Sequence, residues 1–361
     1  MLGLFDGHLL VNDGNAKVND FEPFGSVDLP YNRFDWTLLT TGWSMVILYG
    51  YVLRHVNRME LTKDHRPSLS GNVTNNNASR LANLLLGIHV LIGLIMFAWR
   101  IETNPLAVIL LLIHRVFFTG GVVRSYLLIF WLLNVFATVG YCVRTAIHVK
   151  HISTAHRKFF HLTVSCVAAT GFWYDPAFVV LCGNLIVQLF ITLEILRVNR
   201  VQPWASPLDQ LLLPFLDDQD SNELILTPIH LIGGIFLPTA LELTFGSTAD
   251  GSGYDLPRYF VGIVVVGVGD SAAAVLGSRF GRYHWGVNGR KTVEGSMAMF
   301  VAQIITHGFF FGWTTTLFAP TVWLIYAFCT VVEAGLDRGD NIILPAIGYF
   351  AFRFSNLLFG T

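Results

Sequence analysis

Acidic and basic side chains that could handle a phosphate group lie in an otherwise apolar stretch, Val264–Thr306. An apolar run ends in Gly267-Val268-Gly269-Asp270-Ser271, and a small-residue segment leads to a loop that holds Arg279, Arg282, Arg290 and Lys291. A carboxylate in hydrophobic sequence is costly unless it has a partner. Asp270 could ligate Mg²⁺, which binds one or two carboxylates together with phosphate oxygens. The stretch therefore predicts a site for a nucleotide phosphate tail and a metal ion at a membrane surface.

The residues around Asp270 admit more than one interpretation. Gly267 and Gly269 would let backbone approach a phosphate, and a helix beginning near Ser271 would aim free N–H groups at it. The same glycines could serve helix packing, with Asp270 as an N-cap. The spacing also fits a degenerate dinucleotide-binding pattern. That pattern requires a soluble strand–helix–strand unit, which the apolar spans on both sides disfavour.

The segment Gly286–Ser296 combines cations, hydroxyls and glycines, as a polyphosphate site requires. We expect Arg290 and Lys291 to contact phosphates, and Thr292 and Ser296 to donate hydrogen bonds to them. Glu294 is expected to be a second metal ligand beside Asp270, or to orient Lys291. Asp270, Lys291 and Glu294 are accordingly the candidate catalytic residues. An ordinary charge pair in a loop is the alternative.

Two more polar clusters adjoin apolar runs. Arg157 and Lys158 precede Phe159-Phe160-His161, where they could contact phosphate or simply extend toward the membrane interface. The spacing of His151, His156 and His161 does not form a metal-binding helix face. Glu333, Asp340 and Asn341 favour a polar site, because such groups are costly near a bilayer unless paired. Gly267, Gly269, Ser271, Arg157, Lys158, Asp340 and Asn341 are thus further candidate phosphate or metal contacts.

The composition indicates a membrane protein. The 361 residues are 53% hydrophobic and only 13% charged, against about 25% charged in soluble domains. The net charge of −1 gives no reason to expect a nucleic-acid partner. The four cysteines lie in apolar runs without a Cys-x-x-Cys pair, so neither a disulfide nor a zinc site is expected. The N-terminal residues show no pattern of a cleaved signal peptide.

The hydrophobic segments predict an all-α, polytopic protein with about ten or eleven transmembrane helices in one bundle. We expect a polar lead-in (1–35), N-terminal transmembrane helices (36–150) and a catalytic transmembrane domain (151–361). The expected spans are Trp36–Leu53, Leu81–Trp99, Leu106–Gly120, Val123–Val143, Phe159–Tyr174, Pro176–Leu196, Ile225–Phe245, Pro257–Gly277, Met297–Phe318, Pro320–Ala334 and Ile342–Phe359.

Eleven spans would place the loop Ser278–Lys291 on the more positively charged side, which is normally the cytosol. The loop Arg54–Arg80 would then lie on the opposite side. That loop contains Asn72-Val73-Thr74 and Asn77-Ala78-Ser79, two formal N-glycosylation triplets. The predicted sides of both loops follow from the count of eleven spans.

These motifs, taken in order, resemble the eukaryotic dolichol kinase family over residues 157–348. The resemblance rests on Arg157-Lys158-Phe-Phe-His161, Leu226-Thr227-Pro-Ile-His, Val-Gly-Asp270-Ser, Lys291-Thr-Val-Glu294-Gly-Ser, Ala302-Gln303-Ile304-Ile305, and Glu333 through Asp340-Asn341. Two positions depart from the family pattern: Arg290 stands where Lys is common, and Ser271 where Thr is common. Residues 1–150 match poorly. Polyprenol and phytol kinases and phosphatidate cytidylyltransferases share a looser form of the central motif.

The resemblance implies a multi-pass enzyme of the endoplasmic reticulum, with its catalytic loops in the cytosol. It would transfer the γ-phosphate of CTP to dolichol, with Mg²⁺ or another divalent cation, to give dolichyl phosphate for protein glycosylation. A cytidylyltransferase, another prenol or phytol kinase, and a transporter remain alternatives. No protein partner is implied. The CTP-binding segment maps to Arg290, Lys291, Thr292, Val293, Glu294, Gly295, Ser296, Met297, Ala298, Met299, Phe300, Val301, Ala302, Gln303, Ile304 and Ile305.

Overall fold

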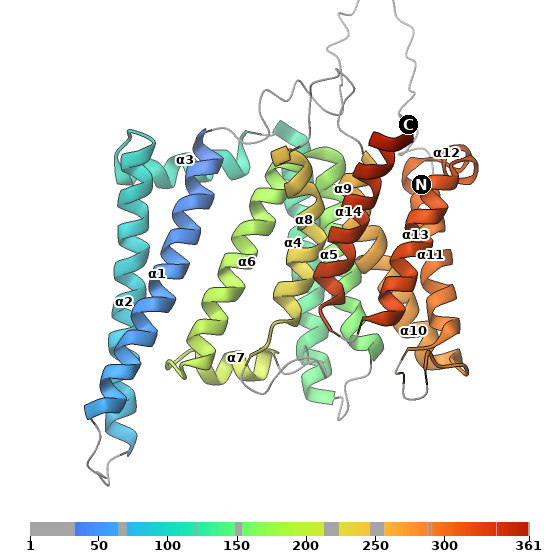
Figure 1. Ribbon diagram of the computed structural model, residues 1–361. Helices are drawn as coiled ribbons and strands as arrows, with labels where there is room; N and C mark the ends of the chain where they lie inside the picture. Colours follow the sequence, from blue (N-terminus) through green and yellow to red (C-terminus); the bar gives the residue numbers. More distant parts are fainter. Residues whose placement is uncertain are drawn as a thin grey trace, which may run out of the picture.

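The computed structural model describes residues 33–63, 71–119, 121–148, 154–212, 224–245, 256–286, 289, 291–336 and 338–359. Within these ranges the regular elements are helices, and His284 and Thr292 form an isolated β-bridge. Figure 1 shows the helices packed side by side. They are α1 (Arg33–Lys63), α2 (Gly71–Arg100), α3 (Pro105–Phe117), α4 (Gly121–His148), α5 (Thr154–Tyr174), α6 (Pro176–Val198), α7 (Ala205–Leu212), α8 (Thr227–Phe245), α9 (Leu256–Gly262), the π-helix η3 (Ile263–Asp270), α10 (Ser271–Phe280), α11 (Val293–Phe311), α12 (Trp313–Phe318), α13 (Pro320–Gly335) and α14 (Asp340–Phe359). The predicted all-α class is confirmed.

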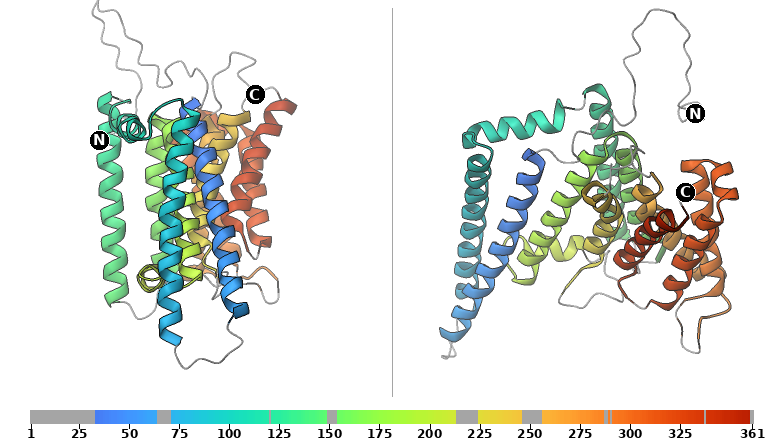
Figure 2. Two further views of the ribbon diagram at one scale, coloured as in Figure 1. Left: turned by 90° about the vertical axis from the view of Figure 1, so that its left-hand side faces the viewer. Right: turned by 45° about the horizontal axis from the view of Figure 1, so that its top comes forward.

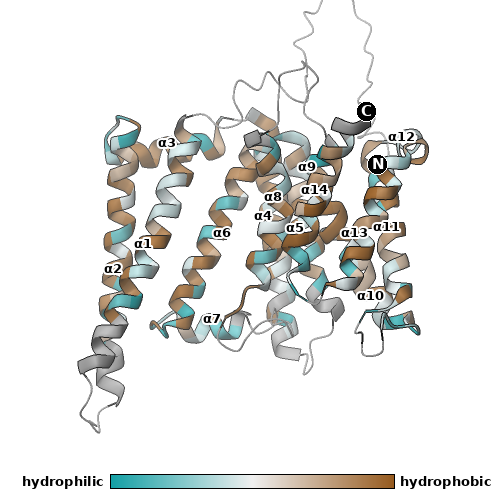
Figure 3. Ribbon diagram, in the orientation of Figure 1, coloured by the Kyte–Doolittle hydropathy of each residue, from teal (hydrophilic) through white to brown (hydrophobic). Residues whose placement is uncertain are grey.

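The helices have the length and surface of membrane spans. Five segments of the described chain are long and apolar enough to cross a bilayer: Phe34–Val56, Asn77–Arg100, Gly121–Thr145, Pro176–Val198 and Pro257–Phe280. They expose large apolar side chains, among them Ile47 (67%), Val90 (66%) and Phe136 (64%), and Figure 3 shows hydrophobic residues along much of the length of helices such as α2 and α6. Soluble monomers rarely expose so much contiguous apolar surface. The chain is a multi-pass membrane protein.

Ten of the eleven predicted spans correspond to long helices or helical runs, and the exception is Leu106–Gly120. This segment is α3, which has 13 residues and is therefore about 20 Å long, too short for a hydrocarbon layer of about 30 Å. Figures 1 and 2 show α3 lying across one end of the bundle, between the ends of α2 and α4. The short helix α7 lies in a segment that the sequence had indicated to be a polar loop.

Because α3 does not cross the membrane, the prediction that the loops Arg54–Arg80 and Ser278–Lys291 lie on opposite sides of it is wrong. The C-terminal end of α1 and the N-terminal end of α2 lie at the same end of the bundle as α7 and the C-terminal end of α10 (Figure 1). Asn72 and Asn77 belong to the first turns of α2 and therefore lie at the end that carries the cationic loop, not opposite it. The cations around Arg54–Arg80 thus add to the positive charge of this end.

A continuous apolar core joins α5, α6, α8, α9, η3, α11, α13 and α14. Its fully buried members include Phe172, Phe260, Val264, Met299 and Tyr326. A separate, smaller cluster packs α1 and α2 against α6, through Tyr49, Leu53, Ala82 and Leu196. The main core therefore fixes η3 relative to α5, α11 and α14, and these are the elements that carry the polar residues singled out above.

Candidate metal and phosphate site

Asp270 ends a π-helical segment in the middle of one uninterrupted helical run. Helices α9, η3 and α10 follow one another from Leu256 to Phe280 without a break. The helical backbone continues from η3 into α10 through Ser271, whose hydroxyl donates to Gly267 O at 2.7 Å, and Asp270 makes no capping hydrogen bond. The expected anion site on free N–H groups at Ser271 is therefore wrong, and so is the N-cap alternative. The dinucleotide pattern is excluded as well, because Ile263–Asp270 is helical rather than a strand.

Gly267 and Gly269 serve helix packing. A Cβ at Gly267 would lie 2.0 Å from Ser165 Oγ on α5, and a Cβ at Gly269 would lie 3.0 Å from Gln303 on α11. Both glycines are buried against these helices, so neither is placed to contact a phosphate. π-helical segments are rare and often lie at functional sites, and here the segment ends at Asp270.

The close approach of η3 to α5 gives a stability prediction. Gly267→Ala places its new methyl group against Ser165 Oγ, and we expect a loss of about 1–3 kcal/mol in the free energy of unfolding. Ser165→Gly, combined with Gly267→Ala, should recover much of that loss by removing the obstructing atoms. Thermal unfolding of the two single variants and the double variant measures the coupling. Additive losses would contradict the contact.

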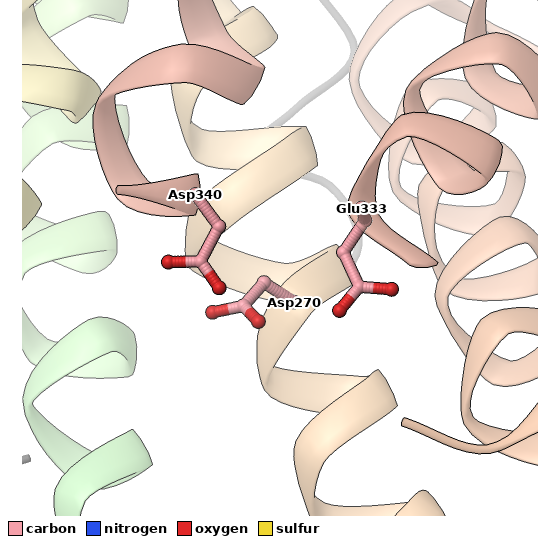
Figure 4. A group of neighbouring side chains, drawn as sticks. All are labelled: Asp270, Glu333 and Asp340. Atoms are coloured by element: carbon pink, nitrogen blue, oxygen red, sulfur yellow. The ribbon is translucent and has the colours of Figure 1, made fainter. Parts of the chain in front are cut away.

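Three carboxylates converge at one end of the bundle. Asp270 from η3, Glu333 from the last turn of α13 and Asp340 from the first turn of α14 each offer an oxygen, and these oxygens lie within 4.8 Å of one another. Figure 4 shows the three side chains pointing toward one another. The chain reverses between α13 and α14 at Gly339, whose φ of +75° suits glycine. Asp270 and Glu333 are 5% and 4% exposed.

Two lysines flank the carboxylates. Lys158 on α5 forms an ion pair with Asp270. The Lys291 ammonium group lies 2.6 Å from Glu333 Oε1 and donates a hydrogen bond to the backbone oxygen of Glu333, also at 2.6 Å. It lies 3.7 Å from Asp340 Oδ2. Glu333, not Glu294, therefore orients Lys291. The side chain of Arg157 and the whole of Arg290 lie outside the described residues, so their predicted phosphate contacts stay predictions.

His161 and Asn341 complete the side of the site that faces α5. His161 Nε2 lies 3.4 Å from Lys158 Nζ, 3.4 Å from Asn341 Oδ1 and 3.7 Å from Asp270 Oδ2. His161 is only 4% exposed. Residues from α5, η3, α13, α14 and the loop before α11 thus meet in one polar group.

The loop before α11 folds back on itself, and side-chain oxygens of Thr292, Glu294 and Ser296 accept hydrogen bonds from groups of the loop and of the first turn of α11. Thr292 caps α11 by accepting a hydrogen bond from Gly295 N at 3.1 Å, and Ser296 Oγ accepts one from the Trp285 indole at 2.9 Å. The Glu294 carboxylate accepts from Tyr283 N at 3.3 Å. Hydrogen bonds from backbone N–H groups, its own first, lower the pKa of Glu294. Glu294 therefore accepts hydrogen bonds from the loop backbone and does not belong to the group formed by Asp270, Glu333 and Asp340.

Most of the predicted nucleotide-binding segment forms the body of α11. Met297, Val301 and Ile305 are more than half exposed on its outer surface. Met299, Gln303 and Ile304 are buried, and Gln303 accepts a hydrogen bond from Thr330 on α13 at 3.3 Å. Among the described residues of the segment, Lys291 is the one that contacts the carboxylate group.

The donor set fits a divalent cation. Ionised Asp270, Glu333 and Asp340 bring three negative charges together, against two positive charges from Lys158 and Lys291. Burying like charges this close is costly without a compensating cation. Carboxylate oxygens are the ligands that Mg²⁺ prefers, and it leaves room for phosphate oxygens. Asp270, Glu333 and Asp340 are therefore the residues that would hold it.

Sequence reasoning placed Asp270, Lys291, Asp340 and Lys158 among the candidates and favoured a polar-site role for Glu333, but it gave His161 no role. Lys158 and His161 are three residues apart on α5 and therefore share one helix face. This spacing could be read from the sequence. A role for His161 could not, because it depends on Asp270 lying next to that helix face.

Comparisons with known proteins identify relatives of much of the chain. The dolichol kinase family model matches residues 68–282. The chain is 33% identical to mouse dolichol kinase over 263 residues, which cover 68% of this chain and 47% of the mouse protein. It is 28% identical over 246 residues to the dolichol kinase EVAN of Arabidopsis thaliana, covering 64% and 41% of the two chains. The chain thus spans about half the length of the curated relatives it matches. No solved structure matches it.

Proposed function

Because the chain belongs to the dolichol kinase family, we propose that it transfers the γ-phosphate of CTP to the terminal hydroxyl of dolichol. The products are dolichyl phosphate and CDP. The observation that carries this proposal is the group of three buried carboxylates flanked by Lys158 and Lys291. Phosphoryl transfer needs mainly positioning and neutralisation of charge, and this group offers both.

We assign each member of the group a part in the transfer. Asp270, Glu333 and Asp340 would hold a divalent cation, which would supply positive charge to the nucleotide phosphates. Lys158, beside Asp270, and Lys291, beside Glu333 and Asp340, stabilise the negative charge of the transferred phosphoryl group. The alcohol oxygen forms the new bond to the γ-phosphorus as the bond to the bridging oxygen breaks, and CDP leaves with that electron pair. The hydroxyl proton passes to Asp270, the carboxylate beside His161.

Product analysis tests this reaction against its closest alternative. Purified protein incubated with dolichol, Mg²⁺ and CTP labelled at the γ-phosphorus should release CDP and carry the label into the lipid. A cytidylyltransferase would release labelled pyrophosphate instead, and a transporter would consume no nucleotide. Either of the last two results would overturn the proposal.

We propose that the chain resides in the endoplasmic reticulum membrane with the carboxylate group facing the cytosol. The support is the distribution of charge. The α10–α11 loop, with Arg282 and Lys291, lies at the same end of the bundle as the C-terminal end of α1 and the N-terminal end of α2, which carry Arg54 and Arg80. Cytoplasmic loops carry an excess of Lys and Arg. Protease protection of tags placed in the α10–α11 loop of membrane vesicles tests the orientation.

Binding of the divalent cation should be visible without turnover. We expect Mg²⁺ or Mn²⁺ at a hundred times its dissociation constant to raise the free energy of unfolding by about 2.7 kcal/mol. Asp340→Asn should lose most of the shift, because it removes one of three ligands. The matched control is Glu242→Gln, since Glu242 is a buried carboxylate outside the group that pairs with Arg258 on α9. Equal shifts in both variants would contradict the assignment.

A further inference from the structure

A cavity of about 430 Å³ lies between α4, α5, α6 and α8. Its floor consists of buried side chains, among them Phe160, His161, Leu231 and Phe236, each no more than 6% exposed. The volume falls within the range of about 300–1,000 Å³ that is usual for ligand pockets. The loop before α11 contributes no residue to its lining.

The wall of this cavity offers almost nothing but apolar surface. Of its polar members, which also include Thr227 and His161, Asn134, Thr138 and Thr163 donate within their own helices, to Phe130 O at 2.9 Å, Asn134 O at 2.7 Å and Phe160 O at 3.1 Å. These donors are therefore satisfied without a ligand. The part of a ligand that contacts this wall is expected to be hydrocarbon, because polar groups would lose their hydrogen bonds to water and find few replacements there.

The cavity opens sideways, onto surface that would face lipid. Its rim is formed by Val135 and Val139 of α4 and by Ile186 and Leu189 of α6, which are 54%, 47%, 38% and 54% exposed. Both helices are candidate membrane spans. A hydrocarbon chain in the bilayer can therefore reach the floor between α4 and α6 without crossing an aqueous surface.

His161 belongs both to the cavity and to the carboxylate group. It lines the floor, and its Nε2 lies 3.7 Å from Asp270 Oδ2 and 3.4 Å from Asn341 Oδ1. A chain that fills the cavity thus ends against the polar group, and a terminal hydroxyl would find its hydrogen-bond partners at that end alone.

We propose that this cavity binds the hydroxyl-bearing end of the isoprenoid alcohol and delivers its oxygen past His161 to the phosphoryl group. The inference rests on the proposed kinase activity and assigns the lipid a site distinct from that of the nucleotide. Only the first isoprene units fit inside, and the rest of the chain extends between α4 and α6 into the bilayer. The chemistry that the site recognises is a primary alcohol at the end of an apolar branched chain.

Narrowing the cavity mouth tests the proposal kinetically. Val135→Trp and Leu189→Trp place an indole at the rim from α4 and α6. Each is expected to raise the KM for dolichol by about tenfold or more, with the KM for CTP unchanged. The matched control is Leu133→Trp, because Leu133 lies about half a helical turn from Val135, is 61% exposed and does not line the cavity. It should change neither constant by more than about twofold.

A binding measurement separates failure of the cavity from failure of the proposed reaction. A polyprenol carrying a photoreactive group near its hydroxyl, applied to Asp270→Asn protein in phosphatidylcholine vesicles, should label α4, α5 or α8 at the cavity. Excess dolichol should compete, and excess phospholipid should not. Labelling spread evenly over the outer faces of the helices, or competition by phospholipid, would overturn the cavity assignment.

The kinetic variants distinguish the two proposals. If the wild-type protein phosphorylates dolichol and the KM values of the rim variants equal that of Leu133→Trp, the cavity assignment is wrong while the proposed kinase activity stands. Absence of phosphorylation by wild type would instead overturn the proposed function.

Discussion

Asp270→Asn is expected to lower the kcat for dolichol phosphorylation by at least about 10³-fold while the protein remains folded. The substitution keeps the shape of the side chain but removes the charge at the centre of the group, where Lys158 pairs with it and where Glu333 and Asp340 converge on it. Asparagine is also a poorer ligand for a divalent cation and a poorer proton acceptor. The measurement is transfer of label from CTP to dolichol by purified variant and wild type.

A control is needed because buried carboxylates also stabilise folds. Glu242→Gln removes a carboxylate that is 3% exposed and is hydrogen-bonded to Tyr349 Oη at 2.9 Å. It should lower stability and leave turnover per folded molecule within about threefold of wild type. If Asp270→Asn and Glu242→Gln reduce turnover equally, Asp270 has no special part in the reaction.

Lys291→Ala is expected to reduce kcat/KM for CTP by about 10²–10³-fold. The ammonium group of Lys291 lies 2.6 Å from Glu333 Oε1 and 3.7 Å from Asp340 Oδ2. Its loss removes positive charge from the transferred phosphoryl group and leaves Glu333 without its partner. The KM for dolichol should change little, because the lipid approaches from the α5 side.

Arg279→Ala is the matched control for Lys291→Ala, since Arg279 is an exposed cation near the end of α10 with no contact to the carboxylates in the described structure. We expect kcat/KM within about twofold of wild type. Equal losses in the two variants would mean that the loop acts through its overall charge, as a cytosolic positive loop does, rather than through Lys291.

Much of the fold follows from the sequence, because long apolar runs leave few alternatives to helices. The boundaries of α5, α6, α8 and α13 agree closely with the predicted spans. The exception, α3, is as apolar as a span but too short, and whether such a segment crosses depends on where its neighbours end. One error of this kind reversed the predicted side of the loop between α1 and α2.

The site could be predicted only in part. Asp270, Lys291 and Asp340 are conspicuous because charge is expensive in apolar sequence. Glu294 is equally conspicuous, and proximity in sequence to Lys291 made it the natural partner. The partner is Glu333 instead, 42 residues away, because the loop before α11 crosses to the end of α13. The glycines before Asp270 suggested phosphate binding, but they allow α5 and α11 to approach η3. Such contacts arise from tertiary packing, which local spacing does not reveal.

The central claim is that Asp270, Glu333 and Asp340 jointly hold the divalent cation that positions the nucleotide. An experimental density map of the protein with Mn²⁺ and CDP tests it most directly. The account predicts a metal peak bonded to oxygens of these three residues at about 2.0–2.6 Å, with the nucleotide phosphates between Lys158 and Lys291. A metal and nucleotide bound elsewhere, with the three carboxylates unchanged, would contradict it.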